Sequence, residues 1–358
     1  MNIKIVGAGP AGLITALYLN KAGYKPTIYE KQNREGYEST PCGEGISHEK
    51  LKKLKKDTGF NSKPNISNGV KKFRMIFPNK KSVEIKREIV FLDRTKWQKS
   101  MIEFLEDKGI EIQFNKEIGD LEDLNYTYLI GADGFNSRVR RKLDIGIDIH
   151  IASQYKMKLK ENIEELKLYI NEMFHYKDLG GYSWVFPKSD IVNVGVSNSF
   201  EVLDKFLDKY NIEGEILSKK ASPVGINGKI FSNTDNNILL VGGAGGLTNS
   251  LTGGGLTPII KSSKFIVDHI KDVRNYDTSI KASSINPQLW KNAASNFYTK
   301  NSIYAKMGNI LNGEKFEFNE KYKKNISLST KIKFLLNPGM WEYLDHNKKI
   351  FDKVFDTF

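Results

Sequence analysis

The chain contains one cysteine, Cys42, within the segment TPCGEGIS that runs from Thr40 to Ser47. Glu44 lies two residues further on, between two glycines. A thiol and a carboxyl group this close together can exchange protons with a substrate in a reaction centre. The same residues can also form an ordinary turn, and the segment by itself leaves both interpretations open.

A second segment, GYSWVFP at 181–187, carries side chains suited to a binding site. Alternate residues of a strand point to the same face, so Tyr182, Trp184 and Phe186 are expected to lie side by side. Together they would form a large, rigid apolar surface for an apolar ligand. Aromatic residues on one strand face also commonly form a core, and that alternative stays open here.

The first element that could position these groups is a strand–turn–helix unit at the N-terminus. Residues 3–6, IKIV, form a short β-branched run, GAGPAG follows at 7–12, and an apolar helix is predicted to end near Gly23. The next predicted strand, 27–30, ends in an acid. This spacing fits the dinucleotide-binding fingerprint, which assigns Gly7 to the turn, Gly9 to backbone approach to pyrophosphate, Gly12 to helix packing and Glu30 to the ribose hydroxyls.

Two further glycine-rich segments follow predicted strands. In YLIGADGFNSRVR, at 128–140, Asp133 and Gly134 occupy a turn, and Ser137 is expected to cap a helix. The third segment begins at Asn237, continues through GGAGG at 242–246 and TGGG at 252–255, and leads into a helix that reaches about Ile270. So many glycines weaken a fold unless a ligand must lie against bare backbone. A helix that begins near Gly255 would present amide donors and a partial positive charge to an electron-rich ring.

In this order and spacing, the three segments resemble the FAD-binding set of the flavoproteins related to aromatic hydroxylases and geranylgeranyl reductases. The resemblance implies a Rossmann-like FAD-binding domain and FAD as the cofactor. Arg94 matches an arginine that often opens the helix after the second sheet in these proteins. The cofactor-binding residues implied are Gly7, Gly9, Pro10, Ala11, Gly12, Glu30, Lys31, Cys42, Gly43, Arg94, Asp133, Gly134, Gly242, Gly243, Gly253, Gly254, Gly255 and Leu256.

Two motifs select the branch of these flavoproteins. The segment from Tyr182 to Pro187 matches the YxWxFP motif of the geranylgeranyl reductase family, and CGEGI at 42–46 resembles the cysteine-containing loop of that family. The resemblance implies an FAD-dependent oxidoreductase that saturates double bonds of geranylgeranyl chains in archaeal-type membrane lipids. The alternatives are an FAD-dependent monooxygenase, a flavin-dependent prenyl isomerase or cyclase, and a flavin-poor lipid-binding protein. Tyr182, Trp184 and Phe186 would then contact the isoprenoid substrate.

The chain departs from the family pattern at two positions. Gly243 stands where the family usually has an aspartate that would bond the ribityl hydroxyls, and Ser250 stands where a proline is common. Loss of one charge-assisted bond weakens binding by about 1.5 to 3 kcal/mol.

Reduction of an isolated alkene needs a proton donor in a dry site as well as a hydride. The candidate acids are Cys42, Glu44 and Tyr182, with protein-held water as a further option, and the sequence does not rank them. The sequence does not distinguish between ferredoxin, a deazaflavin and NAD(P)H as the electron donor. No metal site is predicted.

The predicted architecture is α/β with α+β insertions. The discontinuous FAD-binding domain would cover 1–65, 94–145 and 236–275, interleaved with an antiparallel-sheet substrate domain at 66–93 and 146–235. A helical region at 276–358 would cover the molecule or, with its many lysines, rest on a membrane as an amphipathic lid.

The composition agrees with a folded, basic protein. The chain has 358 residues with a formal net charge of +13, and a single cysteine excludes an internal disulfide. The lysines are spread along the chain without a nucleic-acid-binding motif, so anionic lipid or a phosphorylated substrate is favoured over nucleic acid. The expected location is the cytoplasm, with peripheral contact to the inner membrane face as the further option.

Overall fold

The protein is described by a computed structural model. It covers residues 1–298 apart from 41, 123, 161–162, 171–180, 226–236 and 251, together with 309, 312–313 and 315–317. Most of the predicted helical region at 276–358, including all of its residues from 318 onward, lies outside the described residues.

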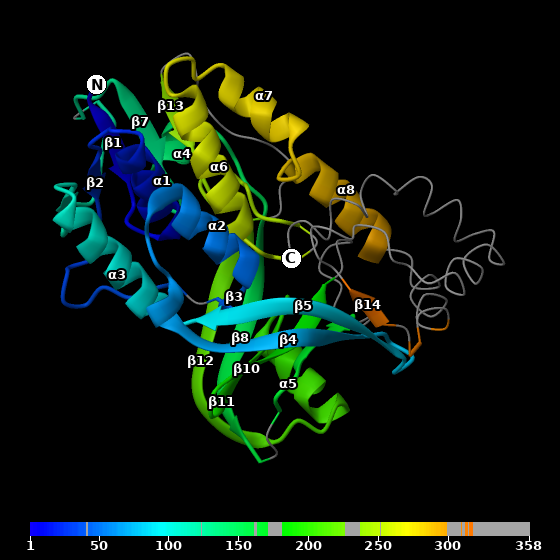
Figure 1. Cartoon of the computed structure of the whole chain (residues 1–358). Helices are drawn as coiled ribbons and strands as arrows, with labels where there is room; N and C mark the ends of the chain where they lie inside the picture. The colour runs from blue at the N-terminus through cyan, green and yellow to red at the C-terminus, as the bar shows by residue number, and fades with distance from the viewer. Residues whose placement is uncertain are drawn as a thin grey trace.

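The first sheet is parallel and contains five strands, with the N-terminal strand in the centre (Figure 1). Its order is β13 (Ile238–Leu240), β7 (Tyr128–Gly131), β1 (Ile3–Val6), β2 (Thr27–Tyr29) and β6 (Glu111–Gln113). In parallel sheets, ligands bind beyond the carboxyl ends of the strands. The three glycine-rich segments follow β1, β7 and β13, so they meet at that edge.

Helices enclose this sheet. They are α1 (Pro10–Lys21), α2 (His48–Thr58), α3 (Arg94–Asp107), α4 (Arg138–Lys142), α6 (Leu256–His269), α7 (Asn275–Ala282) and α8 (Pro287–Tyr298). The predicted helix starts at Arg94 and next to Gly255 are confirmed. Ser137 accepts a hydrogen bond from the Arg140 amide at 2.9 Å, as expected of a helix cap.

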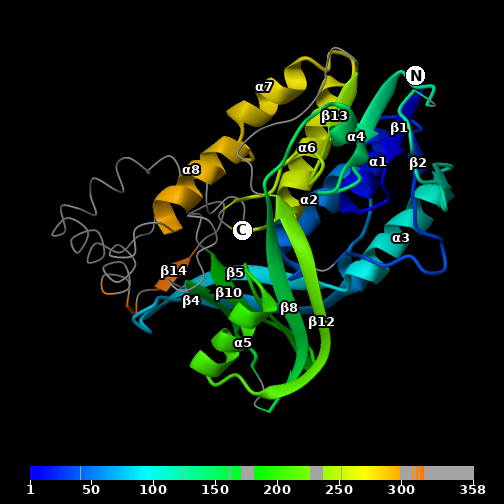
Figure 2. The ribbon, with the colours of Figure 1, turned by 180° about the vertical axis from the view of Figure 1, so that it is seen from behind.

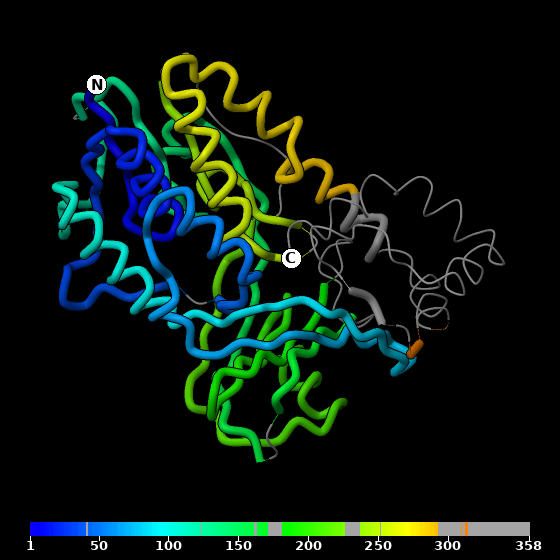
Figure 3. Tube along the Cα trace, viewed as in Figure 1, coloured from blue at the N-terminus to red at the C-terminus, as the bar shows by residue number. Residues whose placement is uncertain are grey.

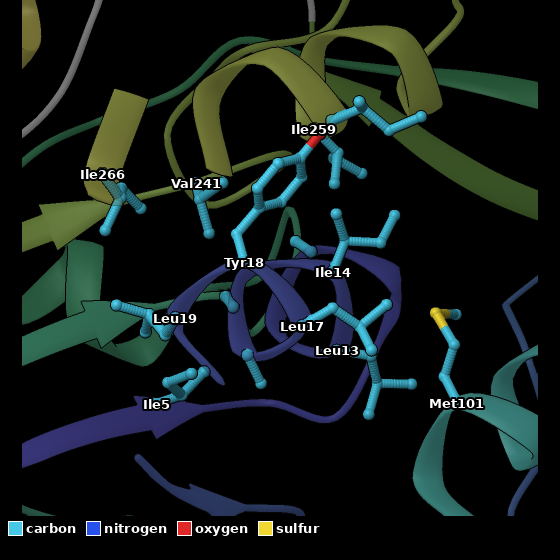
Figure 4. Packing of buried hydrophobic residues seen from close by; sticks show 14 of the residues in the cluster. Ile5, Leu13, Ile14, Leu17, Tyr18, Leu19, Met101, Val241, Ile259 and Ile266 are labelled. Atoms are coloured by element: carbon cyan, nitrogen blue, oxygen red, sulfur yellow. The ribbon is translucent and has the colours of Figure 1, made fainter. Parts of the chain in front are cut away.

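The core of this part lies around α1, which is buried along most of its length. In Figure 4, Leu13 lies towards Met101 of α3, whereas Ile259 and Ile266 of α6 face α1 from the other side. Although Thr15 of α1 and Ser263 of α6 are 248 residues apart in the chain, the trace in Figure 3 places the two helices side by side, and the two hydroxyls lie 2.8 Å apart.

The second sheet contains nine strands and lies next to the first (Figure 2). Its order is β12 (Gly214–Gly225), β8 (Ile149–Leu159), β11 (Ile191–Val196), β10 (Tyr182–Lys188), β9 (Leu166–Ile170), β4 (Ile66–Ile76), β5 (Ser82–Leu92) and β14 (Lys315–Glu317), with β3 (Gly45–Ser47) also paired to β5. Helix α5 (Phe200–Lys209) packs on its outer face through Leu203 and Phe206. A 3-10 turn at Lys63–Asn65 leads into β4.

The strand pairing refines the expectation of an antiparallel sheet. Most pairs are antiparallel, but β4–β9 and β14–β5 are parallel. These two pairs join segments that are far apart in the chain, so no hairpin fixes their direction. β14 is also a strand within the region that was expected to be helical.

No helix in the described part of the chain has the length and apolarity needed to cross a bilayer.

Candidate active site

A cavity of about 690 Å³ lies between the glycine turns of the first sheet and the inner face of the second. This volume falls within the range typical of small-molecule and cofactor sites. The predicted cofactor residues that line it are Gly7, Gly9, Pro10, Ala11, Glu30, Lys31, Cys42, Gly43, Arg94, Asp133, Gly134, Gly243, Gly253, Gly255 and Leu256. Three others do not line it: Gly12, Gly242 and Gly254.

The turn between β1 and α1 uses each of its glycines differently. Gly7 has a φ of +104°, and a Cβ on Gly12 would lie 1.9 Å from the Gly7 carbonyl oxygen, so both are required by the fold. Gly9 is different, because a Cβ there would meet nothing within 4 Å and would project into the cavity. The missing side chain at Gly9 therefore leaves room for a ligand to reach the backbone.

Glu30 lies at the end of β2 and is buried. Its Oε2 accepts a hydrogen bond from the Ala8 amide at 2.8 Å, and its Oε1 accepts one from the Gln32 amide at 2.9 Å. Each carboxylate oxygen can accept a second hydrogen bond. Glu30 thus braces the glycine turn and can still accept bonds from ribose hydroxyls in the cavity.

The sequence analysis missed a buried network that supports the same turn. Arg94 donates to Gln98 at 3.0 Å, Gln98 donates to the Tyr37 hydroxyl at 2.7 Å, and Tyr37 donates to the Ala8 carbonyl at 2.6 Å. Burial raises the pKa of Tyr37 well above its usual range, so its proton stays in place. Gln98 lies four residues after Arg94 and therefore on the same helix face. This spacing is the sequence feature that could have indicated the contact between them.

The loop after β7 explains why position 243 is a glycine and not the aspartate that is usual in the family. Asp133 accepts a hydrogen bond from the Arg138 amide at 2.6 Å and so holds the start of α4. The Phe135 ring lies about where a side chain on Gly243 would go, with its Cε1 3.0 Å from the Cβ position. Phe135 therefore occupies space that the aspartate usual in the family would need.

The third glycine-rich segment closes the cavity at the start of α6. Gly253, Gly255 and Leu256 line it, whereas a Cβ on Gly242 would lie 2.9 Å from the Cβ of Ala11. Gly242 therefore serves close packing on α1. Ser250, which stands in place of the common proline, is buried and also lines the cavity.

Five polar atoms on cavity-lining residues are buried and have no hydrogen-bond partner in the described part of the chain. They are Arg94 Nε, Asp133 Oδ1, Gln154 Oε1, Trp184 Nε1 and Ser250 Oγ. Buried polar groups without partners are rare in folded proteins. Their concentration here fits a cavity that is completed by a polar ligand, and the open Cβ position of Gly9 fits the pyrophosphate of a dinucleotide such as FAD.

At the other end of the cavity, β10 carries the three predicted aromatic residues in a row. The Tyr182 and Trp184 ring centroids are 5.6 Å apart, and those of Trp184 and Phe186 are 6.1 Å apart. A Cβ on Gly195 would lie 2.2 Å from the Trp184 indole, and one on Gly43 would lie 2.7 Å from the Phe186 ring. Glycines in two neighbouring segments therefore let the rings lie flat against backbone.

A smaller cavity of about 150 Å³ adjoins this end. It is bordered by apolar side chains of the second sheet, among them Phe73, Ile89, Leu166 and Leu168. Cys42, Tyr182 and Phe186 line both cavities. Cys42 thus lies where the larger, partly polar cavity meets the apolar one.

The surroundings of the three candidate acids differ. The Glu44 carboxylate forms an ion pair with the Lys188 ammonium and accepts a hydrogen bond from Asn193 at 3.2 Å. The Tyr182 hydroxyl donates to the Thr252 carbonyl at 2.5 Å, and burial, followed by the proximity of Cys42, raises the pKa of Tyr182 well above its usual range. Cys42 Sγ accepts a hydrogen bond from the Glu44 amide at 3.3 Å.

The fold and this site define a class of protein. Residues 1–172 match the FAD binding domain family. FAD is thereby confirmed as the predicted cofactor, the predicted Rossmann-like, interleaved α/β fold is confirmed, and the relatives named reductases below support an FAD-dependent oxidoreductase.

Proteins of similar sequence and structure indicate which FAD-dependent proteins this chain resembles. The chain is 28% identical over 294 residues to a digeranylgeranylglycerophospholipid reductase of Methanococcus vannielii, covering 72% of this chain and 73% of that protein. A geranylgeranyl bacteriochlorophyll reductase-like structure from Thermoplasma acidophilum superposes with a TM-score of 0.77 at 21% identity, over 96% of this chain and 98% of that one. A flavoprotein/dehydrogenase from Cytophaga hutchinsonii matches with a TM-score of 0.67 at 14% identity, over 100% and 97%. The predicted resemblance to geranylgeranyl reductases is confirmed.

Proposed function

We propose that this protein is an FAD-dependent reductase that saturates carbon–carbon double bonds of geranylgeranyl chains, in particular those of archaeal-type membrane lipids. The observation that carries the proposal is the junction of the two cavities at Cys42. The larger cavity suits a polar cofactor on one side of this junction, and the smaller one suits an apolar alkene segment on the other. The names of the relatives support the substrate class.

The side chains at the junction suit the reaction. Reduced FAD, when bound, supplies a hydride. Tyr182, Trp184 and Phe186 hold an alkene and exclude water, and Trp184 is only 7% exposed. A proton delivered to the less substituted alkene carbon leaves positive charge on the tertiary carbon, which the hydride then neutralises. The product gains two hydrogen atoms for each double bond.

Cys42 is the proton donor that we propose. The Glu44 side chain is engaged by Lys188 and Asn193, and the Tyr182 hydroxyl donates to the Thr252 carbonyl. Of the three candidates, the Cys42 thiol alone lies at the junction without donating its proton to a described residue. Water held by the protein is the competing donor.

Anaerobic incubation of chemically reduced protein with a geranylgeranyl lipid, followed by mass spectrometry of the product, tests the function. We expect the mass to increase by two hydrogens per reduced bond. An unchanged mass with a rearranged product would indicate an isomerase or cyclase. Oxygen incorporation under air would indicate a monooxygenase, and a colourless protein that binds lipid but no FAD would indicate a binding protein.

The electron donor and the membrane contact are separate proposals. The larger cavity is lined by five cationic residues. Arg138 and Lys220 form ion pairs with Glu117 and Glu38, and the other three, Lys31, Lys116 and Arg141, support approach of an anionic partner. Anaerobic flavin bleaching by reduced ferredoxin, reduced deazaflavin and NAD(P)H, measured in parallel, identifies the donor. Flotation with vesicles of anionic or neutral lipid tests peripheral binding, which we expect on anionic vesicles alone.

A further inference from the structure

A buried ion pair lies behind the loop that carries Cys42. The side chains of Lys188 and Glu44 are 9% and 13% exposed, and Asn193, which donates to the same Glu44 oxygen, is fully buried. Lys188 ends β10 and Asn193 lies on β11, opposite Phe186. The Glu44 carboxylate therefore ties the Cys42 loop to the β10–β11 hairpin that carries the aromatic row.

The backbone at Glu44 is held in an unusual conformation. Its φ of +67° is uncommon for a residue with a side chain, and such a conformation persists only where contacts enforce it. The Glu44 carbonyl accepts a hydrogen bond from the Leu92 amide at 3.1 Å, and the Glu44 amide donates to Cys42 Sγ. The direction of the Cys42 thiol is thus coupled to the position of Glu44.

Stability alone gives little reason for this ion pair. Replacing both partners of a buried ion pair by uncharged side chains is often neutral or stabilising, whereas removing one partner leaves an uncompensated charge. A buried pair that joins a reactive loop to the opposite side of its pocket is better explained by the geometry that it fixes.

We propose that Lys188 is a positioning residue, which acts through the Glu44 carboxylate to hold the Cys42 thiol at the junction of the two cavities. The kinetic consequence rests on the proposed function. The effect on the loop itself does not, because it can be measured at the thiol.

The experiment uses the full-length holoprotein with Lys188→Met, Lys188→Arg, Glu44→Gln and the double variant Glu44→Gln/Lys188→Met. Lys160→Met is the matched control, because Lys160 forms an exposed ion pair with Glu213 outside both cavities. Cys42 is the only cysteine, so the rate of its alkylation by iodoacetamide reports on this loop alone. The midpoint of thermal unfolding, kcat and KM are measured alongside.

We expect Lys188→Met to retain FAD, to raise the alkylation rate about fivefold or more through local opening, and to lower kcat about tenfold with little change in KM. Lys188→Arg should preserve both rates. The double variant is decisive. Removing both charges should restore the midpoint of thermal unfolding, because no unpaired charge is left buried. The alkylation rate should nevertheless stay high and kcat should stay low.

Recovery of kcat and thiol protection together with the midpoint in the double variant would show that the pair has only a structural role. Equal alkylation rates in Lys188→Met and the Lys160→Met control would also overturn the proposal. If the wild-type protein reduces no prenyl lipid, the proposed function fails, but the alkylation result still decides whether Lys188 positions the loop. If Lys188→Met does not fold, the double variant carries the test.

Discussion

The two ends of the cavity are built in different ways. The nucleotide end is formed largely by backbone, because Gly7, Gly9 and Gly12 provide a turn without side chains and Glu30 braces it. The opposite end is formed by side chains from several segments, with the aromatic row of β10 facing Cys42 and the Glu44–Lys188 pair. Adding side chains at the first end should therefore weaken FAD binding. At the second end, removing side chains or breaking the ion pair should lower turnover.

The largest effect is expected at Gly12. A Cβ there would lie 1.9 Å from the Gly7 carbonyl oxygen, so Gly12→Val must move α1 away from β1. Overpacking of this kind costs about 3 kcal/mol or more, and FAD should be lost with it. Thermal unfolding and the flavin absorbance measure both effects. Gly119→Ala is the control, since a Cβ there meets nothing within 4 Å and Gly119 does not line the cavity. An unchanged unfolding midpoint in Gly12→Val would contradict the packing described here.

The variant Gly9→Ala tests FAD binding at the same turn without a change in the packing of the fold. The new methyl group would project into the cavity without touching the protein. We expect the unfolding midpoint of the FAD-free protein to stay the same, while the dissociation constant for FAD rises about 10- to 100-fold, or ~1.4 to 2.8 kcal/mol. Fluorescence titration with FAD measures the change. FAD binding as tight as in the wild-type protein would mean that the pyrophosphate does not approach Gly9.

At the other end, Cys42→Ala should leave FAD bound and lower turnover at least about tenfold, or ~1.4 kcal/mol. The reason is loss of the proposed proton donor at the junction, where the side chain contributes little packing. Single-turnover rates with a geranylgeranyl lipid provide the measurement. Unchanged rates would remove Cys42 from the mechanism and leave protein-held water as the donor.

The smallest effect is expected for Tyr182→Phe. It removes one hydrogen bond to the Thr252 carbonyl, worth about 0.5 to 1.5 kcal/mol of stability, and should change turnover less than threefold. Because burial raises the Tyr182 pKa above its unfolded value near 10, the wild-type protein should lose unfolding free energy as the pH rises above 10, and the variant should lose less. A tenfold loss of turnover in Tyr182→Phe would instead identify Tyr182 as the acid.

Much of the nucleotide end could be predicted from the sequence. The strand, turn and helix around Gly7 to Gly12 are local in the chain, and their spacing is set by backbone geometry. The resemblance to flavoproteins indicated the helix start at Arg94, and the glycine pattern indicated the one next to Gly255. Residue roles at this end remain predictions, because they depend on a bound ligand.

The other end could be predicted only in part. The alternation of Tyr182, Trp184 and Phe186 gave their common face, and extending it by two residues would have added Lys188. Its partner Glu44 lies 144 residues away, and their meeting depends on the positions of β3 and β10 in one sheet. Likewise, Phe135 meets Gly243 because β7 and β13 are neighbours, which no local pattern reveals.

The most direct test of a flavin held beside an alkene at the junction of the two cavities is anaerobic stopped-flow reoxidation. Photoreduced holoprotein is mixed with a geranylgeranyl lipid, and the flavin absorbance near 450 nm is followed while the loss of double bonds is counted in the product. We predict that the flavin reoxidises without oxygen, with one flavin turnover for each double bond saturated. A flavin that stays reduced with the lipid bound, and reoxidises only when air is admitted, would contradict the account.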